Sequence, residues 1–292
     1  MYKSLFALFL CNLFVCLQSI AQESKATDKI TWRTIDWPPF YILDAENKGQ
    51  GIYDQLISKL ASGLPEYKHY RLKMNTIRAQ KLLSAGKKIC HPSTIKKTEN
   101  QENFQLSLLN SIVLPHRIII RASKADLLPK GKSLSLKALF KINSLRIGVS
   151  EDSYTQTINH IVNQNKNQPN VLINNNYDVL ITLLLNNRLD VIIQYPVVFS
   201  YRARQAAVSD KFLTYLIDEE AASSYIPVYI ACPKNEWGKK LITKINKILI
   251  EESLSPSFLH SRLYWYGEEE KAILRRFYRE FYFIDKTTTK HQ

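Results

Sequence analysis

The sequence has 292 residues, 45% of them hydrophobic, which is enough for a sizeable core in one large or two ordinary domains. Its formal net charge is +14, and such an excess suits nucleic acid, an anionic membrane surface or an anionic ligand. The lysines are scattered rather than gathered in one block, which favours a generally basic surface. No internal repeat and no Cys/His spacing typical of a zinc site is found, and we expect neither a metal nor a cofactor.

The first 21 residues have the pattern of a secretory signal peptide. Lys3 gives a positive start, residues 4–17 are almost wholly apolar, and Ser19-Ile20-Ala21 places small residues where a signal peptidase reads them. We predict cleavage after Ala21 and a location in the periplasm. The apolar run is short for a membrane anchor, and the residues before Cys16 are not those of a lipoprotein. Secretion argues against a nucleic-acid partner.

From residue 30 onward, short apolar strands alternate with helices. Strands are predicted at 30–35, 68–74 and 89–90, with helices at 52–62 and 77–85. The first helix has one apolar face at helical spacing, and Gly63 and Pro65 end it. This β-α-β-α-β order predicts a doubly wound, mainly parallel sheet.

A second series of strands and helices follows. Strands are predicted at 104–109, 112–114, 118–121, 145–149, 171–173, 190–194 and 226–232, and helices at 154–163, 177–187, 237–250 and 268–281. The two series predict two α/β lobes, and crossings near Pro115 and Ile226 form a two-strand hinge with the ligand site between the lobes. The predicted lobes are 22–115 plus 227–284, and 116–226, followed by a flexible tail at 285–292.

The stretch Asp36-Trp37-Pro38-Pro39-Phe40-Tyr41 follows the first strand. Two prolines and several aromatic residues at a strand end form a stiff apolar surface, as a small-molecule cleft in an open sheet requires. Trp37, Phe40 and Tyr41 are therefore predicted to stack on a planar or apolar ligand. Packing beneath the sheet is the alternative.

Several motifs occur in the order found in one family. They are Trp37-Pro38-Pro39-Phe40, Gly51 to Asp54, Gly86 to Cys90, Thr98-Glu99 before Phe104-Gln105-Leu106-Ser107, Arg146-Ile147-Gly148-Val149, Asn187-Arg188-Leu189-Asp190-Val191 and Tyr229-Ile230-Ala231-Cys232-Pro233-Lys234. Over roughly residues 29–265 the chain resembles the family 3 extracellular solute-binding proteins, the substrate-binding domains of ABC transporters with the type II periplasmic-binding fold. The resemblance implies a monomer that closes two lobes on a small molecule for an inner-membrane permease or a sensor.

Two departures from the family bear on the ligand. Amino-acid binders of this family carry an arginine for the ligand carboxylate, where this sequence has Asn100. They also carry an aspartate for the ligand ammonium, where this sequence has Tyr195. The resemblance therefore implies a small polar or aromatic ligand that is not a standard amino acid.

Two basic residues are candidates through the resemblance. Arg78 begins a helix whose family counterpart faces the cleft, so it could replace the missing arginine, or it could be a surface residue. Lys97, beside Lys96, lies in the loop that normally carries ligand contacts, and a solvated charge pair is the alternative.

Polar residues at two strand ends are further candidates. Ser150, Asp152 and Ser153 begin a helix, where backbone N–H groups could bind an anionic or carbonyl group, or serve as an ordinary cap. Gln194 and Tyr195 follow another strand and could hydrogen-bond a polar ligand.

After the signal peptide, Cys90 and Cys232 are the only cysteines. In an oxidising compartment two cysteines most simply form one disulfide, with two buried thiols as the alternative. The family topology places the return strand beside the strand that carries Cys90, which implies a Cys90–Cys232 bond inside the first lobe.

Two other functions are compatible with the sequence. Some proteins of this fold, similar to cyclohexadienyl dehydratases, are enzymes, and the candidate acid/base residues here are His91, Glu151 and Asp152. None has a partner at triad or paired-carboxylate spacing, so we predict a binding protein and not an enzyme. An interaction module without a ligand is the other alternative.

Overall fold

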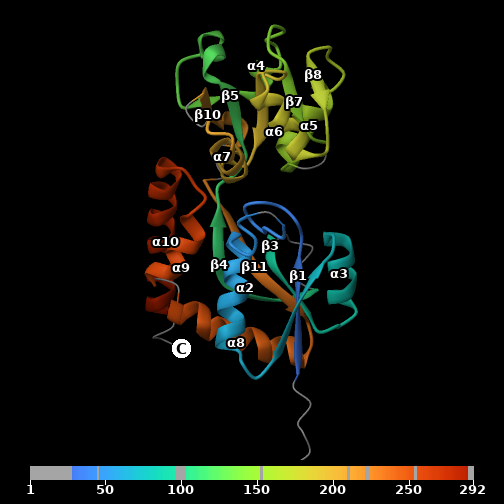
Figure 1. The fold of residues 1–292 in the computed structure, drawn as a ribbon, viewed down its shortest axis with the longest axis vertical. Coiled ribbons are helices and arrows are strands. Elements are labelled where there is room, and N and C mark those ends of the chain that lie inside the picture. The colour runs from blue at the N-terminus through green and yellow to red at the C-terminus, as the bar shows by residue number, and fades with distance from the viewer. Residues whose placement is uncertain are drawn as a thin grey trace, which may run out of the picture.

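A computed structural model describes residues 28–288, apart from 45, 96–102, 152–153, 209–210, 221–223 and 253–254. The predicted signal peptide lies outside the described residues, as do Lys97, Asn100, Asp152 and Ser153. Two α/β lobes lie one above the other, each built on its own sheet (Figure 1). None of the helices in the described part combines the length and apolar character needed to cross a membrane.

The first lobe contains a five-stranded sheet in the order β2-β1-β3-β11-β4. Its strands are β1 (Lys29–Thr34), β2 (Lys68–Lys73), β3 (Ile89–Ile95), β4 (Phe104–Val113) and β11 (Ile226–Pro233). β1 runs parallel to β2 and β3, and β11 runs antiparallel to β3 and β4. Helices α2 (Ile52–Gly63) and α3 (Thr76–Ser84) connect the parallel strands, which confirms the predicted doubly wound pattern.

The second lobe contains a six-stranded sheet in the order β6-β10-β5-β9-β7-β8. Its strands are β5 (Arg117–Arg121), β6 (Ser133–Leu134), β7 (Ile147–Val149), β8 (Val171–Ile173), β9 (Val191–Gln194) and β10 (Phe212–Ile217). Its helices are η3 (Ala122–Leu127), α4 (Leu136–Leu139), α5 (Gln156–Asn165), α6 (Tyr177–Leu185) and α7 (Pro196–Gln205). Branched apolar side chains of β5, β7 and β9 are fully buried, as expected for central strands covered on both faces.

Two connections join the lobes. Residues 114–116 link β4 to β5, and residues 218–225, which begin with η5 (Asp218–Glu220), link β10 to β11. β4 and β11 are hydrogen-bonded neighbours in the first lobe, so both connections leave from the same place (Figure 1). This arrangement confirms the predicted pair of lobes with a two-strand hinge.

The C-terminal helices lie along the first lobe and reach the hinge. They are α8 (Glu236–Glu252), α9 (Pro256–Leu263) and α10 (Glu268–Thr288) (Figure 1). The Tyr278 hydroxyl accepts a 2.8 Å hydrogen bond from the backbone N–H of Ile112 in β4. Trp265, between α9 and α10, packs edge-on at 5.0 Å against Tyr201 of the second lobe. α10 extends to Thr288, so helix occupies the start of the segment predicted as a flexible tail.

The disulfide is present as predicted, between Cys90 of β3 and Cys232 of β11, with Cα atoms 4.4 Å apart. β11 is antiparallel to β3 and pairs Ala231 with His91. One further step along that register places Cys232 opposite Cys90. The bond therefore joins neighbouring strands in the middle of the first lobe's sheet.

Seven elements were not predicted from the sequence, namely the short η3, β6, α4 and η5 and the longer α7, β10 and α9. Two predicted strands are one. α7 is buried on several sides, including at Pro196, Val198 and Phe199, so its sequence lacks the one-sided pattern of a surface helix. β10 exposes Leu213 and Leu216, which breaks the alternation expected of a strand. The apolar segments at 104–109 and 112–114 form the continuous strand β4.

Candidate functional site

The aromatic stretch at residues 37–41 forms a tight loop that packs against the first turn of helix α2. Trp37 and Tyr41 exchange backbone hydrogen bonds of 3.2 and 3.1 Å across the loop. The carbonyl groups of Pro39 and Phe40 accept hydrogen bonds from the first N–H groups of α2, at 2.9 and 2.8 Å. These N–H groups have no partner within the helix, so the loop satisfies them and is itself held in place. Trp37 is half-buried, and Phe40 and Tyr41 are buried.

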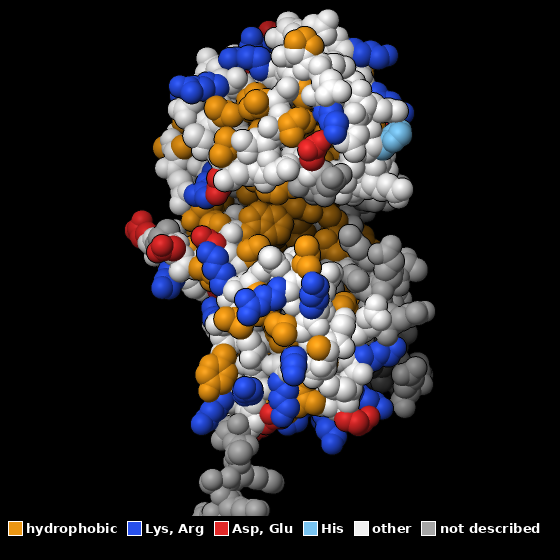
Figure 2. All heavy atoms as spheres, turned by 90° about the vertical axis from the view of Figure 1, so that its right-hand side faces the viewer, with side chains coloured by type: hydrophobic (Ala, Val, Ile, Leu, Met, Phe, Trp, Pro, Cys, Tyr) orange, Lys and Arg blue, Asp and Glu red, His pale blue; other side chains and the backbone are white. Residues whose placement is uncertain are grey.

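The loop faces a tyrosine from the second lobe. Tyr195, at the start of α7, lies 5.9 Å from the ring of Trp37 and 6.1 Å from that of Phe40, edge-on to both. A cavity of about 50 Å³ opens between them and is called the aromatic cavity here. Its lining consists of Trp37, Phe40, Tyr53, Ser93, Ile95, Val113, Tyr195, Ile226 and Val228. Hydrophobic side chains line the hollow between the two lobes (Figure 2).

His116, in the first connection between the lobes, extends this aromatic group. Its ring packs 3.8 Å from Tyr195 and meets Tyr154 edge-on at 5.0 Å. Burial lowers the pKa of His116 to about 3, so the ring is neutral at physiological pH. Both of its nitrogens are buried without a hydrogen-bond partner, as are Trp37 Nε1 and Gln194 Nε2. Buried polar atoms without partners are uncommon, and here they border the space between the lobes.

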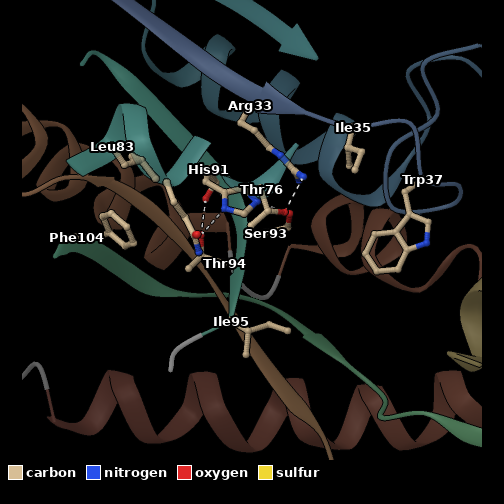
Figure 3. Close-up of a pocket in the computed structure, with 11 residues that line it drawn as sticks. Arg33, Ile35, Trp37, Thr76, Leu83, His91, Ser93, Thr94, Ile95 and Phe104 are labelled. Carbon is tan, nitrogen blue, oxygen red and sulfur yellow. Dashed lines mark hydrogen bonds between the residues drawn. The ribbon is translucent and has the colours of Figure 1, made fainter. Parts of the chain in front are cut away.

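A second and larger cavity, of about 270 Å³, lies in the first lobe beside the aromatic cavity. It is called the Arg33 cavity here, and its lining consists of Arg33, Ile35, Trp37, Thr76, Gln80, Leu83, His91, Ser93, Thr94, Ile95 and Phe104. Trp37, Ser93 and Ile95 line both cavities. In Figure 3 the polar side chains lie in the middle, between Leu83 and Phe104 on one side and Trp37 on the other.

Arg33 is the charged residue in this wall, and it is only 4% exposed. Its Nε donates to the Met74 carbonyl at 3.1 Å and its Nη2 to the Thr76 hydroxyl at 3.3 Å. Burial lowers the pKa of Arg33, while the neighbouring Tyr41 opposes that shift. The guanidinium is thus buried among neutral oxygen atoms.

His91 lies beside Arg33 in a chain of hydroxyl groups. Its Nδ1 is 3.0 Å from the Thr94 hydroxyl, which also donates to the His91 carbonyl at 3.2 Å. Because that hydroxyl has one proton, Nδ1 is assigned as the donor and Nε2 as the acceptor. Nε2 faces the Ser93 hydroxyl at 3.4 Å, which pairs with Tyr41 at 2.9 Å. Burial, and next the charge of Arg33, lowers the pKa of His91 to about 3.

The polar candidates of the second lobe are mostly engaged within that lobe. Ser150 is fully buried, and its hydroxyl donates to Asn175 at 3.0 Å. Gln194 is buried as well and accepts a hydrogen bond from the Tyr195 backbone N–H at 2.7 Å. Tyr195 is therefore the one of these three side chains that lines a cavity.

The remaining candidates lie apart from the cavities. Arg78 is exposed in the first turn of α3 and lines neither cavity. Glu151 forms a 2.6 Å ion pair with Lys166. Tyr41 is fully buried and lines neither cavity, but its hydroxyl is hydrogen-bonded to that of Ser93 at 2.9 Å. Among the described residues, no three His, Cys, Asp or Glu side chains are grouped closely enough to hold a metal ion.

Sequence reasoning missed Arg33, His116 and Tyr53 as site residues. Arg33 could have been found, because an arginine in the middle of the apolar strand Ile30-Thr31-Trp32-Arg33-Thr34-Ile35 is unusual. His116 and Tyr53 carry no comparable signal, since their contacts with Tyr195 and Phe40 depend on tertiary packing.

Comparison with known proteins shows the fold of the chain. No family model matches the sequence, and no curated protein matches it. Among solved structures, an ancestral cationic amino acid solute-binding protein is similar with a TM-score of 0.62 at 16% identity, covering 82% of this chain and 96% of its own. Another structure of that protein is described as a precursor of cyclohexadienyl dehydratase.

Two further structures have the same fold. A histidine kinase sensor domain with similarity to periplasmic binding proteins has a TM-score of 0.58 at 12% identity, covering 82% of this chain and 96% of its own. An amino acid ABC transporter substrate-binding protein from Streptococcus pneumoniae, bound to L-arginine, has a TM-score of 0.55 at 15% identity, covering 80% and 91%. The chain thus has the type II periplasmic-binding-protein fold.

Proposed function

We propose that this protein is a periplasmic solute-binding protein that captures a small polar or aromatic ligand between its lobes. The observation that carries the proposal is the aromatic cavity, because Trp37 and Phe40 line it from the first lobe and Tyr195 from the second. A ligand held between these rings would bridge both lobes and favour the closed arrangement. Trp37 also has an unpartnered ring nitrogen, which would supply a polar contact.

The domain limits and location are part of the same proposal. We place the lobes at residues 22–115 plus 227–284 and at 116–226, after a signal peptide that ends at Ala21. The mature protein would act as a monomer and pass its ligand to an inner-membrane ABC permease or a sensor. The transporter protein and the sensor domain that share its fold support these two partners equally.

A standard amino acid is a poor fit as the ligand. Tyr195 stands where the family's binders of amino acids have an aspartate, and it presents an aromatic ring to the cavity. Catalysis also fits poorly, since none of the described residues that line the two cavities is Asp or Glu. A base as weak as His91, with its pKa near 3, suits proton abstraction badly at neutral pH.

A ligand screen tests this proposal. Thermal unfolding is measured across a metabolite panel, together with native mass spectrometry of the protein as purified. A true ligand at a hundredfold excess over its Kd adds about 2.7 kcal/mol to the free energy of unfolding. Trp37→Ala is expected to remove that stabilisation, whereas Tyr70→Ala, at an exposed tyrosine of β2, keeps it. The absence of any stabilising compound and of any co-purified small molecule would refute ligand capture.

A further inference from the structure

Arg33 is a buried charge that the packing of the first lobe does not explain. In the part of the chain that the structure describes, no Asp or Glu pairs with it. Asp54, the buried carboxylate of α2, is paired with Arg71 instead, at 3.2 Å. Buried charges in proteins are normally paired or bind a ligand, because removal from water is otherwise too unfavourable.

The donors of Arg33 are only partly used. The guanidinium carries five N–H groups, and its hydrogen bonds to Met74 and Thr76 occupy Nε and one position on Nη2. The Tyr41 hydroxyl accepts a further hydrogen bond from the guanidinium, which leaves N–H groups over. The hydroxyl of Thr76 and the amide of Gln80 lie in the same wall of the cavity. Together these groups form a donor-rich, positively charged patch.

The size and walls of the cavity restrict the anion. About 270 Å³ is enough for a small organic acid, and the ends of the cavity are apolar at Leu83, Phe104 and Trp37. One guanidinium matches one carboxylate, whereas a phosphate dianion calls for more positive charge than this wall provides. His91 adds no charge, since its ring is neutral.

We propose that the Arg33 cavity binds the carboxylate of an organic acid whose apolar or aromatic body extends past Trp37 into the aromatic cavity. The two cavities share Trp37, Ser93 and Ile95, so one ligand can occupy both. This proposal rests on the proposed function and narrows it to a class of ligand. It also assigns the anion contact to Arg33 of β1. In the family's binders of amino acids that contact comes from an arginine after β3, at the position of Asn100 in this sequence.

The test compares acids with their amides. Binding of phenylacetate, indole-3-acetate, benzoate and glutarate, and of the corresponding amides, is measured by the fluorescence of the purified full chain after unfolding and refolding to remove bound ligand. The wild type is expected to bind at least one acid about 10- to 100-fold more tightly than its amide, as a charge-assisted contact would give. Arg33→Gln abolishes this preference, and Arg78→Gln, at the exposed arginine of α3, preserves it.

Further variants keep the test decisive. Arg33→Lys retains the charge and is expected to retain part of the preference. Thr76→Val leaves the guanidinium in place and is expected to weaken acid binding several-fold with no change for the amide, which covers the case in which Arg33→Gln does not fold. Equal affinity for acids and amides, no binding of any of the acids, or an unchanged preference in both Arg33→Gln and Thr76→Val would overturn the proposal. The solute-binding function itself would still stand if native mass spectrometry showed another small molecule.

Discussion

The two lobes meet across the same space but contribute to it differently. The first lobe supplies the aromatic loop, a buried arginine and a neutral histidine, and it contains the larger cavity. In the second lobe the polar groups at the strand ends bind one another, as Ser150 binds Asn175, and Tyr195 is the described side chain of that lobe that lines the aromatic cavity. We infer that the first lobe determines which ligand is bound and that the second lobe mainly closes over it.

The largest expected effect concerns the disulfide that holds the first lobe's sheet together, for which the second lobe has no counterpart among its described residues. The Cys90–Cys232 bond spans 142 residues of sequence, including all of the second lobe. Replacing both cysteines by alanine is expected to lower the free energy of unfolding by about 2–5 kcal/mol, measured by urea denaturation. A reductant should destabilise the wild type similarly but leave the double variant unchanged. Equal stability of the wild type, the reduced wild type and the double variant would contradict this role of the disulfide.

The next prediction concerns pH and the buried histidines of the first lobe and the hinge. In the unfolded chain their pKa has its ordinary value near 6.5, but burial lowers it to about 3 in the folded protein. Between these values the unfolded chain binds protons that the folded chain does not, so stability falls as the pH drops from about 6.5 toward 3. Urea unfolding at a series of pH values measures this loss.

A matched pair of variants identifies the source of the pH dependence. His116→Leu removes one buried titrating group and is expected to flatten the decline below pH 6.5. His160→Leu, at an exposed histidine of the second lobe, should leave the slope as it is. The same slope in both variants would mean that the ring of His116 is not held neutral.

The smallest effects come from one serine in each lobe. Ser93→Ala is expected to weaken ligand binding about 5- to 10-fold, the cost of one hydrogen bond in a buried site, because Ser93 lines both cavities. Ser150→Ala is expected to lower stability by about 1 kcal/mol, because Asn175 loses one of its two donors, without changing affinity more than twofold. Calorimetric titration measures the ligand affinity of both variants. A larger loss of affinity from Ser150→Ala would reverse the roles of the lobes.

Much of the fold was predictable because it depends on local pattern. Helix α2 has its apolar residues at helical spacing and a glycine at each end, so its position could be predicted from periodicity. The loop at Trp37 was also recognisable, since prolines and aromatic residues rarely gather at a strand end without a reason. Two of the longer elements that were missed, α7 and β10, depend on packing against distant segments, which no local pattern records.

The site was predicted less completely for a related physical reason. Trp37, Phe40 and Tyr195 lie at strand ends, which the alternation of elements indicates. Arg33 lies within a strand, and its importance follows from the absence of a carboxylate partner among the described residues, which only the packed structure reveals. His116 lies in the connection between the lobes, and its contact with Tyr195, 79 positions away in the sequence, is visible only in the folded chain.

The most direct test of ligand capture between the lobes is amide hydrogen exchange with and without the ligand found in the screen. The account predicts that the ligand slows exchange in both lobes at once, in residues 36–42 beside Trp37 and in residues 192–199 beside Tyr195. Protection in only one of these segments, or confined to the α9–α10 surface, would contradict it.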